Sequence, residues 1–233
     1  MSKDWTKIRA KVKDFIESEI YPKETELAKG TPEAREMLGS LMQLAKDEKI
    51  WALGHPEDIG GGGMPFMEYV YVNEVIGRSS FAMVALGTHS LQDSIMLREF
   101  ASPHWRDQYL EPLVQGEIFP SFGMTEPDVA SSDPTQLQTT AILDNGTWKI
   151  NGTKWFTTGA ARAAYTTVMC RTELDAPSHG AFSMIIVPTD NPGYKIVRET
   201  PVLGINGGHY EVKYDNVEVP EENLLGPRGQ GFI

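Results

Sequence analysis

The sequence predicts an α+β protein: an N-terminal all-α helical domain followed by an antiparallel β domain of the barrel or sandwich type. Up to about residue 115, apolar side chains recur at the three- and four-residue spacing of helices. After Phe119 the chain changes to short runs rich in β-branched and aromatic residues. Helical and β-rich halves in this order favour two packed domains. We therefore predict a helical domain over residues 1–118 and a β domain over residues 119–224.

The first two helices are predicted from apolar spacing and from end signals. Residues 5–20 place apolar side chains on one helical face, and Pro22 is expected to end this helix because proline has no N–H to donate. Thr31 followed by Pro32 is typical of a helix start, an N-cap side chain before a first-turn proline. The second helix then continues its apolar face as far as Ala45.

Three further helices are expected before the β domain. After a loop at residues 55–65, apolar residues at helical spacing over 67–75 mark a third helix. Residues 81–101 are expected to form a fourth, largely buried helix. Ser102 and Pro103 are expected to open the fifth.

The β domain is predicted from a series of short runs separated by turn residues. Two Asn–Gly pairs, Asn145–Gly146 and Asn151–Gly152, favour type I′ turns between strands. Several short strands at regular spacing suggest an antiparallel sandwich or barrel. The expected strands lie in residues 137–144, 147–152, 154–158, 165–172, 181–189, 194–200 and 210–219.

Composition excludes several classes of function. The chain carries 21 Lys+Arg against 32 Asp+Glu, a net charge of −11, which argues against nucleic acid because its affinity comes largely from basic side chains on phosphates. One cysteine, Cys170, excludes an internal disulfide and a cysteine-cluster metal site. The five histidines show no metal-ligand spacing, so no metal site is predicted.

Sorting and nucleotide motifs are also missing from the sequence. No signal-peptide run and no apolar stretch of about 18 residues is present, so we expect a cytoplasmic protein without membrane insertion. The quartet Gly60–Gly63 lacks the Gly-Lys-Ser/Thr ending of a phosphate loop and is interpreted as a flexible or close-packed turn. Neither G-x-G-x-x-G in a dinucleotide-binding context nor G-x-S-x-G occurs.

A polar stretch, FGMTEPDVASSD at residues 122–133, lies at the junction of the two halves. One interpretation is a polar turn, whose hydroxyls and carboxylates cap local backbone N–H groups around Pro127. A surface turn of this kind explains the composition without any ligand.

A second stretch, KWFTTG at residues 154–159, raises a functional alternative. Trp155 and Phe156 are expected to face opposite sides of a strand, so that one ring looks away from the interior. That ring either covers the surface under a loop or a neighbouring domain, or forms a lid on a planar ligand. The hydroxyls of Thr157 and Thr158 flank it as donors in the second case.

Together the two stretches resemble the acyl-CoA dehydrogenase family. The motifs F-x-M-T-E-P-x-x-A-S-S-D and N-G-x-K-W-x-x-x-G occur in the family's order, after a helical domain and within a β domain. A closing V-x-V-P-x-x-N-L-L-G also matches, so the resemblance covers essentially the whole chain. It implies FAD bound in an extended pose, with the isoalloxazine ring against the β domain.

The resemblance also implies a role for individual residues. Groups of the loop at residues 122–125 meet the pyrimidine edge of the flavin, the threonine matching Thr157 bonds flavin N5, and the aromatic matching Trp155 covers the ring. The serine matching Ser132 touches flavin phosphate or acyl-CoA, with Ser131 as a rival because TEPDVASSD is one residue longer than the commoner TEPxAGSD form. The implied substrate-binding residue is Ser132, and the implied cofactor-binding residues are Phe122, Met124, Thr125, Ser131, Ser132, Trp155, Phe156 and Thr157.

No catalytic residue is predicted within the chain. The family takes the α-proton with a glutamate in a C-terminal helical domain, so the base is expected beyond Ile233, and residues 225–233 are interpreted as the start of that domain. Glu126 is taken as structural. The chain is therefore expected to be a truncated or partial acyl-CoA dehydrogenase, inactive alone or completed by a partner chain.

The resemblance finally implies partners and leaves alternatives open. An acyl-CoA substrate, an electron-transferring flavoprotein as acceptor and a homo-oligomer of the complete protein are expected. Acyl-CoA oxidases, nitroalkane oxidases and flavin-dependent monooxygenases of the same fold are alternative functions. A non-catalytic binding or assembly subunit without cofactor is the alternative from a different class.

Overall fold

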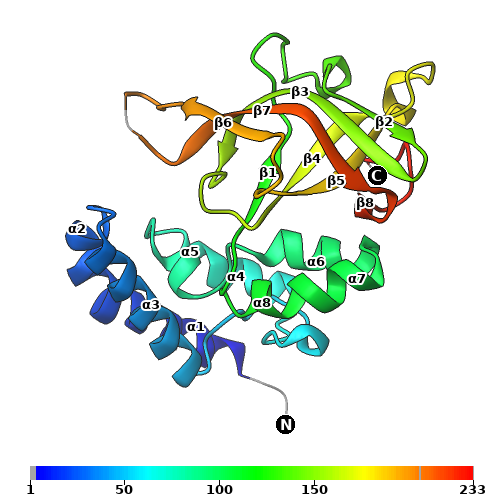
Figure 1. Cartoon of the computed structure of the whole chain (residues 1–233). Helices are drawn as coiled ribbons and strands as arrows, with labels where there is room; N and C mark the ends of the chain where they lie inside the picture. The colour runs from blue at the N-terminus through cyan, green and yellow to red at the C-terminus, as the bar shows by residue number, and fades with distance from the viewer. Residues whose placement is uncertain (1–3, 205, 233) are drawn as a thin grey trace. The chain divides into compact units, whose positions relative to one another are not determined.

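The computed structural model describes residues 4–204 and 206–232, which divide into two compact units (Figure 1). The first unit contains the residues up to Ile95 together with Val114–Glu117, and the second contains Met96–Leu113 and the chain from Ile118 onward. Residues 96–113 therefore belong to the same compact unit as the sheet, although they precede the domain boundary predicted at residue 118. Ile233, the last residue of the segment 225–233 interpreted as the start of a further domain, lies outside the described residues.

The first helical stretch runs further than its sequence predicts. Helix α1 (Trp5–Phe15) is followed without interruption by a π-helical turn η1 (Ile16–Ile20), a 3-10 turn η2 (Tyr21–Lys23) and α2 (Glu24–Leu27). The prediction that Pro22 ends the helix is wrong. The wide turn before it, in which Tyr21 N–H bonds Ile16 O, shifts the hydrogen-bond partners so that the missing proline N–H is tolerated.

The next two helices follow their predicted start signals and spacing. Helix α3 (Pro32–Asp47) begins as predicted, since the Thr31 hydroxyl accepts a hydrogen bond of 3.3 Å from the N–H of Ala34. A 3-10 turn η3 (Glu57–Ile59) precedes α4 (Phe66–Ile76), the predicted third helix, which contacts α1. The exposed residues of α4 include four large apolar side chains, Phe66, Met67, Val70 and Tyr71.

The predicted fourth helix is two helices. Helix α5 (Ala82–Ala85) and helix α6 (Leu91–Phe100) are separated by a break in which Gly87 takes φ +68°. A Cβ on Gly87 would lie 2.5 Å from the ring of Trp51, so the chain turns where only glycine fits. The predicted fifth helix opens at Ser102 and comprises α7 (Pro103–Trp105), η4 (Arg106–Leu110) and α8 (Glu111–Val114).

The second unit contains one eight-stranded sheet, in the order β6-β7-β3-β2-β4-β5-β8 with β1 beside β4. Most neighbours are antiparallel, whereas β1–β4 and the single pair Thr140–Arg171 of β2–β4 are parallel. The predicted order of helices followed by a mostly antiparallel β domain is confirmed. The strands are β1 (Pro120–Gly123), β2 (Thr140–Asp144), β3 (Thr147–Thr158), β4 (Tyr165–Arg171), β5 (Phe182–Pro188), β6 (Tyr194–Glu199), β7 (His209–Pro220) and β8 (Leu224–Leu225), with 3-10 turns η5 (Pro134–Gln136), η6 (Ser178–Gly180) and η7 (Glu221–Asn223).

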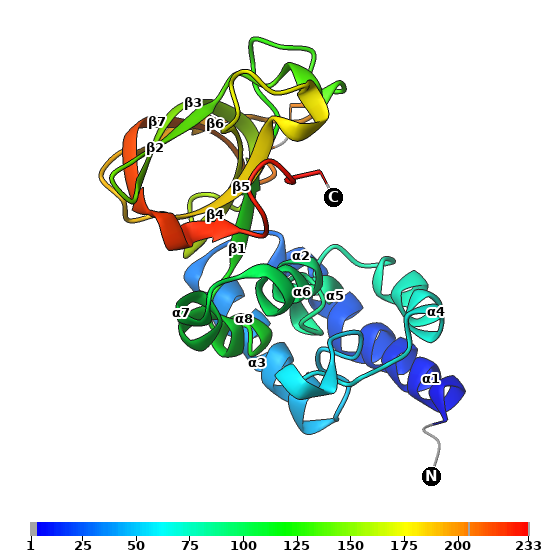
Figure 2. The same ribbon diagram turned by 90° about the vertical axis from the view of Figure 1, so that its right-hand side faces the viewer.

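The sheet is not a closed barrel. It curls round on itself in Figure 2, but among the described residues the path of paired strands begins at β6 and ends at β8 without joining them. The closed-barrel form of the prediction is therefore corrected to an open, mixed sheet. Two sheet edges remain, and each has to be covered in another way.

The two Asn–Gly pairs behave differently. Asn145 and Gly146 connect β2 to β3 as a two-residue hairpin loop, and both have the positive φ that the predicted type I′ turn requires. Asn151 and Gly152 instead lie inside β3, so the prediction of a turn there is wrong. Gly152 marks a register shift against β7, and a Cβ on it would lie 2.4 Å from the Thr139 hydroxyl.

Two of the apolar clusters within the second unit involve the interior of the sheet and its helical cover. The first is built around the fully buried rings of Trp148 and Tyr214 from β3 and β7. In the second, Trp105 of α7 packs with Tyr165 and Leu225. The Trp105 indole N–H donates to Asn223 Oδ1 at 3.3 Å.

The residues after β8 return along β5. Gly229 N–H donates to Ser183 Oγ and Gly231 N–H donates to Phe182 O, each at 2.8 Å. The rings of Phe182 and Phe232 lie 5.2 Å apart between centroids. Within the described ranges 4–204 and 206–232, no helix has the length and apolar character needed to cross a membrane.

Candidate functional site

The two stretches singled out in the sequence lie side by side in the structure. The loop at residues 122–133 follows β1, and Thr125 meets Trp155 of β3 in both directions. Trp155 N–H donates to Thr125 O at 3.0 Å, and the Thr125 hydroxyl donates to Trp155 O at 2.8 Å. The loop is therefore paired with β3 as if it extended the sheet at this point.

A buried ion pair lies directly beneath this contact. Lys154 Nζ is 2.8 Å from Glu126 Oε1 and also donates to Met124 O at 2.8 Å. The other hydrogen bonds of the carboxylate come from the backbone N–H groups of Gln138 at 2.7 Å and Thr139 at 2.9 Å. With side-chain exposures of 0% for Lys154 and 5% for Glu126, these bonds replace solvent almost completely.

The environment of the pair fixes the charge of Glu126. Burial acts to raise the pKa of Glu126, but the charge of Lys154 and the hydrogen bonds it accepts outweigh burial and leave the pKa below its ordinary value. Burial lowers the pKa of Lys154, while Cys170 and Glu126 act in the opposite direction. Glu126 is thus an ionised carboxylate fully occupied by its own chain, which suits a structural group and not a proton acceptor for a substrate.

The two serines of the stretch occupy different positions. Ser131 Oγ accepts from Glu126 N–H at 2.8 Å and lies 3.2 Å from Glu126 O, so it closes the loop on itself. Ser132 is exposed, and among the described residues no hydrogen bond of its hydroxyl is seen. Asp133 caps the following turn by accepting from Thr135 N–H at 3.1 Å.

Strand β3 contains a bulge at Trp155 and Phe156. Lys154 pairs with Val212 and Thr157 with Tyr210, so β3 has one residue more than β7 over this interval. Phe156 takes a positive φ of 49°, and its ring lies 4.8 Å from that of Trp155. The prediction that the two rings face opposite sides is wrong, because the bulge interrupts the alternation of the strand. Phe156 is 39% exposed.

The same bulge separates the two threonines. Thr157 is fully buried, and within the described part of the chain its hydroxyl has no hydrogen-bond partner. Thr158 is exposed, and its hydroxyl lies 2.8 Å from Nδ1 of His209, its register partner on β7. The ring of His209 also meets that of Phe156 edge-on at 6.4 Å. Phe156, Thr158 and His209 are thus gathered at one end of β3 and β7.

The sequence indicated Thr158 only as a hydroxyl donor beside Thr157, and it indicated no role for His209. Strict strand alternation carries no sign of the bulge that exposes Thr158, and His209 lies 51 residues further along the chain. The other predicted residues, Phe122 and Met124, are partly buried. Met124 packs against the apolar cluster that contains Met169 and Phe182. The backbone N–H groups of Met124 and Thr125 make no hydrogen bond within the described residues.

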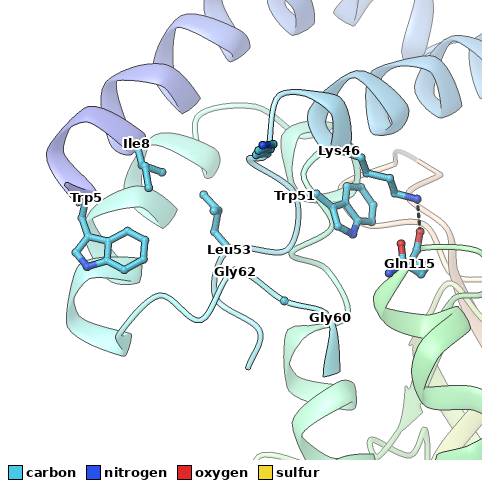
Figure 3. A pocket seen from close by; sticks show the side chains of 10 residues that line it. Trp5, Ile8, Lys46, Trp51, Leu53, Gly60, Gly62 and Gln115 are labelled. Carbon is cyan, nitrogen blue, oxygen red and sulfur yellow. Dashed lines mark hydrogen bonds between the residues drawn. The ribbon is translucent and has the colours of Figure 1, made fainter. Parts of the chain in front are cut away.

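The glycine quartet lies in the first unit, and three of its members, Gly60, Gly61 and Gly62, line a cavity of about 470 Å³ (Figure 3). A Cβ on Gly61 would lie 2.2 Å from His55 O, and one on Gly62 would lie 2.7 Å from Leu53 Cα. Lys46, which Figure 3 labels, donates to Gln115 O at 2.8 Å. These contacts support the interpretation of a close-packed turn.

Comparison with protein families matches both halves of the chain. Residues 2–117 match the N-terminal domain of acyl-CoA dehydrogenases, and residues 121–217 match the middle domain. "Probable acyl-CoA dehydrogenase FadE2" of Mycobacterium tuberculosis is 38% identical over 238 residues, which cover 96% of this chain and 58% of that protein. Human "Acyl-CoA dehydrogenase family member 11" is 34% identical over 95% of this chain and 30% of its own length.

Solved structures give the same result. A Mycobacterium abscessus protein assigned as an acyl-CoA dehydrogenase matches with a TM-score of 0.90 and 32% identity, over 99% of this chain and 62% of that one. A glutaryl-CoA dehydrogenase from Mycobacterium smegmatis in complex with FADH2 matches with a TM-score of 0.76 and 25% identity, over 97% and 56% of the two chains. The chain thus spans less than two thirds of the length of these relatives. Through its N-terminal and middle domains, the chain belongs to the acyl-CoA dehydrogenase family.

Proposed function

We propose that this chain provides the flavin-binding face of an FAD-dependent acyl-CoA dehydrogenase. The observation that carries the proposal is the pairing of Thr125 with Trp155, which joins the loop at residues 122–133 to the end of β3. Membership of the family supports the cofactor class, and the relative from Mycobacterium smegmatis is described with FADH2.

The groups on this face suit a planar, hydrogen-bonding ring. Its polar edge needs donors. The N–H groups of Met124 and Thr125 make no hydrogen bond within the described residues, while the carbonyls of both residues accept hydrogen bonds from β3. Its flat surface needs an aromatic or apolar partner, and the paired rings of Trp155 and Phe156 offer one. Phe122 completes the proposed edge from β1.

Two threonines compete for the contact with the centre of the ring. The resemblance assigns Thr157, whose buried hydroxyl lacks a partner and would gain one from a ligand atom only if that atom entered the enclosed position. Thr158 is exposed near Phe156, and its hydroxyl, 2.8 Å from His209 Nδ1, is open to a ligand from solvent. We therefore propose Thr157 or Thr158 as the hydroxyl donor, with Thr158 favoured by its exposure.

Ser132 is proposed for a contact with flavin phosphate or the acyl-CoA. Its exposure leaves the hydroxyl available, whereas Ser131 bonds Glu126 within the loop. Ser131 is accordingly proposed to act on the cofactor only through the shape of the loop.

Bound FAD would supply the hydride acceptor for α,β-dehydrogenation of an acyl-CoA thioester. The part of the chain would be to bind and orient. Fixed N–H and O–H donors stabilise negative charge that develops beside them, because they need no rearrangement during the reaction. The bulged end of β3 and the tied loop hold such donors on a rigid sheet. We assign no catalytic base to a described residue.

An acyl-CoA substrate, an electron-transferring flavoprotein as acceptor and assembly as a homo-oligomer are further parts of the proposal, supported by family membership. The acceptor decides between a dehydrogenase and the oxidase or monooxygenase alternatives. Rapid reaction of the reduced flavin with oxygen would favour the oxidase or monooxygenase alternative.

Titration of the purified chain with FAD tests the proposal. We expect a yellow complex with quenched flavin fluorescence and a saturable binding curve. Variants Trp155→Ala and Phe156→Ala are expected to weaken binding and alter the flavin spectrum. A wild-type chain that stays colourless after reconstitution would contradict the proposal and favour the non-catalytic subunit.

A further inference from the structure

The Glu126–Lys154 pair is too deeply buried to touch a ligand, yet it binds the loop at Met124, next to Thr125. Lys154 reaches Met124 O from one side, and Glu126 accepts the N–H groups of Gln138 and Thr139 from the other. The bonds converge from three separate segments: the loop, β3 and the residues before β2.

Packing around the pair leaves the loop no freedom to slide. A Cβ on Gly123, the residue before Met124, would lie 3.0 Å from the Tyr214 hydroxyl and 3.4 Å from Lys154 Cγ. The loop therefore leaves β1 in close contact with the aliphatic stem of Lys154. Water has no access to replace a lost partner, so each bond of the pair is tied to one loop position.

Stability alone does not explain an ion pair in this place. Desolvation of two charges offsets most of their attraction, and apolar residues of similar volume commonly serve as well. What apolar residues do not offer is a donor for Met124 O and acceptors for two successive N–H groups. The chemistry of the pair thus matches a requirement for position.

We infer that the Glu126–Lys154 pair is a positioning device that fixes residues 124–126 on β3 and so sets the direction of the Met124 and Thr125 N–H groups. The expected effect on FAD binding rests on the proposed function. The fixing of the loop depends only on contacts within this chain, and it is tested without any ligand.

The double variant Glu126→Gln/Lys154→Met tests whether the buried pair holds the loop in place. It removes both buried charges together, so no uncompensated ion remains, and it keeps the shape of both side chains. Lys149→Met is the matched control, because Lys149 lies on the same strand and pairs with Glu218 at 3.3 Å on the exposed surface. Amide hydrogen exchange of residues 122–133, followed by mass spectrometry, reports the loop, and exchange of β4 and β5 reports the fold.

We expect exchange of the loop to rise about tenfold or more in the double variant while β4 and β5 exchange as in the wild type. FAD binding should weaken by a similar factor, with a shifted flavin spectrum. The Lys149→Met control should change neither measurement. If the double variant does not fold, Glu126→Gln/Lys154→Gln, which also leaves no unpaired buried charge and keeps a polar group on each side chain, provides the same comparison.

Loop exchange and FAD affinity that equal those of Lys149→Met would overturn the inference. A wild-type chain that binds no FAD would instead remove the proposed function. In that event the exchange comparison still decides whether the pair fixes the loop.

Discussion

Thr158 Oγ1 lies 2.8 Å from Nδ1 of His209, across the last residue pair of β3 and β7. The preceding residue, Thr157, points its hydroxyl into the sheet, where it has no partner within the described residues. The bulge in β3 decides which of the two neighbouring threonines is buried, Thr157, and which is exposed, Thr158. This difference makes their roles separable by mutation.

Thr158→Val should weaken FAD binding, because the exposed hydroxyl is the one that a ligand on the side of Phe156 reaches. A lost hydrogen bond of this kind corresponds to a change of about 3- to 10-fold in Kd. Thr157→Val is the matched variant and should leave Kd unchanged, since it replaces an unpartnered buried hydroxyl by a methyl group of the same shape. Fluorescence titration measures both, and the reverse pattern would assign the contact to Thr157.

Glu126 makes the stability of the second unit sensitive to acid. Burial opposes ionisation, but Lys154 and the hydrogen bonds leave the folded-state pKa of Glu126 below its ordinary value of 4.5. A carboxyl group with a lowered folded pKa adds stability above its unfolded pKa and loses it as pH falls through the folded value. The difference in unfolding free energy between wild type and Glu126→Gln should therefore shrink below pH 4.5.

Denaturant unfolding followed by circular dichroism at a series of pH values measures this difference. Other carboxylates, Asp133 among them, contribute equally to wild type and variant and cancel in the subtraction. A difference that stays constant from pH 7 down through the acid range would show that Glu126 does not carry the effect.

Gly152→Ala should destabilise the sheet strongly. Its φ of +153° disfavours any side chain, and the added Cβ would lie 2.4 Å from the Thr139 hydroxyl and 2.8 Å from Thr139 Cα. Strain and overpacking together correspond to about 2–4 kcal/mol. Gly146→Ala is the control, because its φ is also positive but nothing lies within 4 Å of the added Cβ. It should cost about 1–2 kcal/mol, and equal losses for the two variants would argue against the steric account.

Acyl-CoA should not bleach the flavin of the reconstituted chain. Two of the three carboxylates of the loop are occupied, because Glu126 is bound to Lys154 and Asp133 caps the turn at Thr135. The third, Asp128, is exposed, and we assign no base to it. Anaerobic absorbance with a panel of acyl-CoA thioesters of different chain length measures the reaction, with dithionite as a positive control for reducible flavin. Bleaching by any thioester would contradict this prediction and point to a base within the chain.

Local patterns in the sequence predicted the order of elements well. Apolar spacing located the helices, and the Thr31–Pro32 start and the Asn145–Gly146 hairpin followed from short-range backbone chemistry. The failures came from interactions that are not local. The helical stretch continues past Pro22 because the π turn before it changes the hydrogen-bond partners. The turn expected at Asn151–Gly152 is replaced by a strand paired with β7.

The candidate site shows the same division. The motif at residues 122–133 was found from its composition, but its partner Lys154 was not, because a lysine within a strand is ordinarily exposed. Their ion pair joins residues 28 positions apart, and no local signal announces it. The bulge at Phe156 also has no local signal in the sequence, because it depends on the register of two long strands.

The open sheet has a consequence for behaviour at high concentration. An unpaired strand edge is a template for adding a strand from another molecule. The β5 edge is occupied by β8 and by the returning glycines Gly229 and Gly231. The β6 edge carries Lys195 and Arg198, which disfavour a like strand beside them. Deleting residues 226–232 should therefore expose the part of β5 that these residues cover and increase edge-to-edge association between chains.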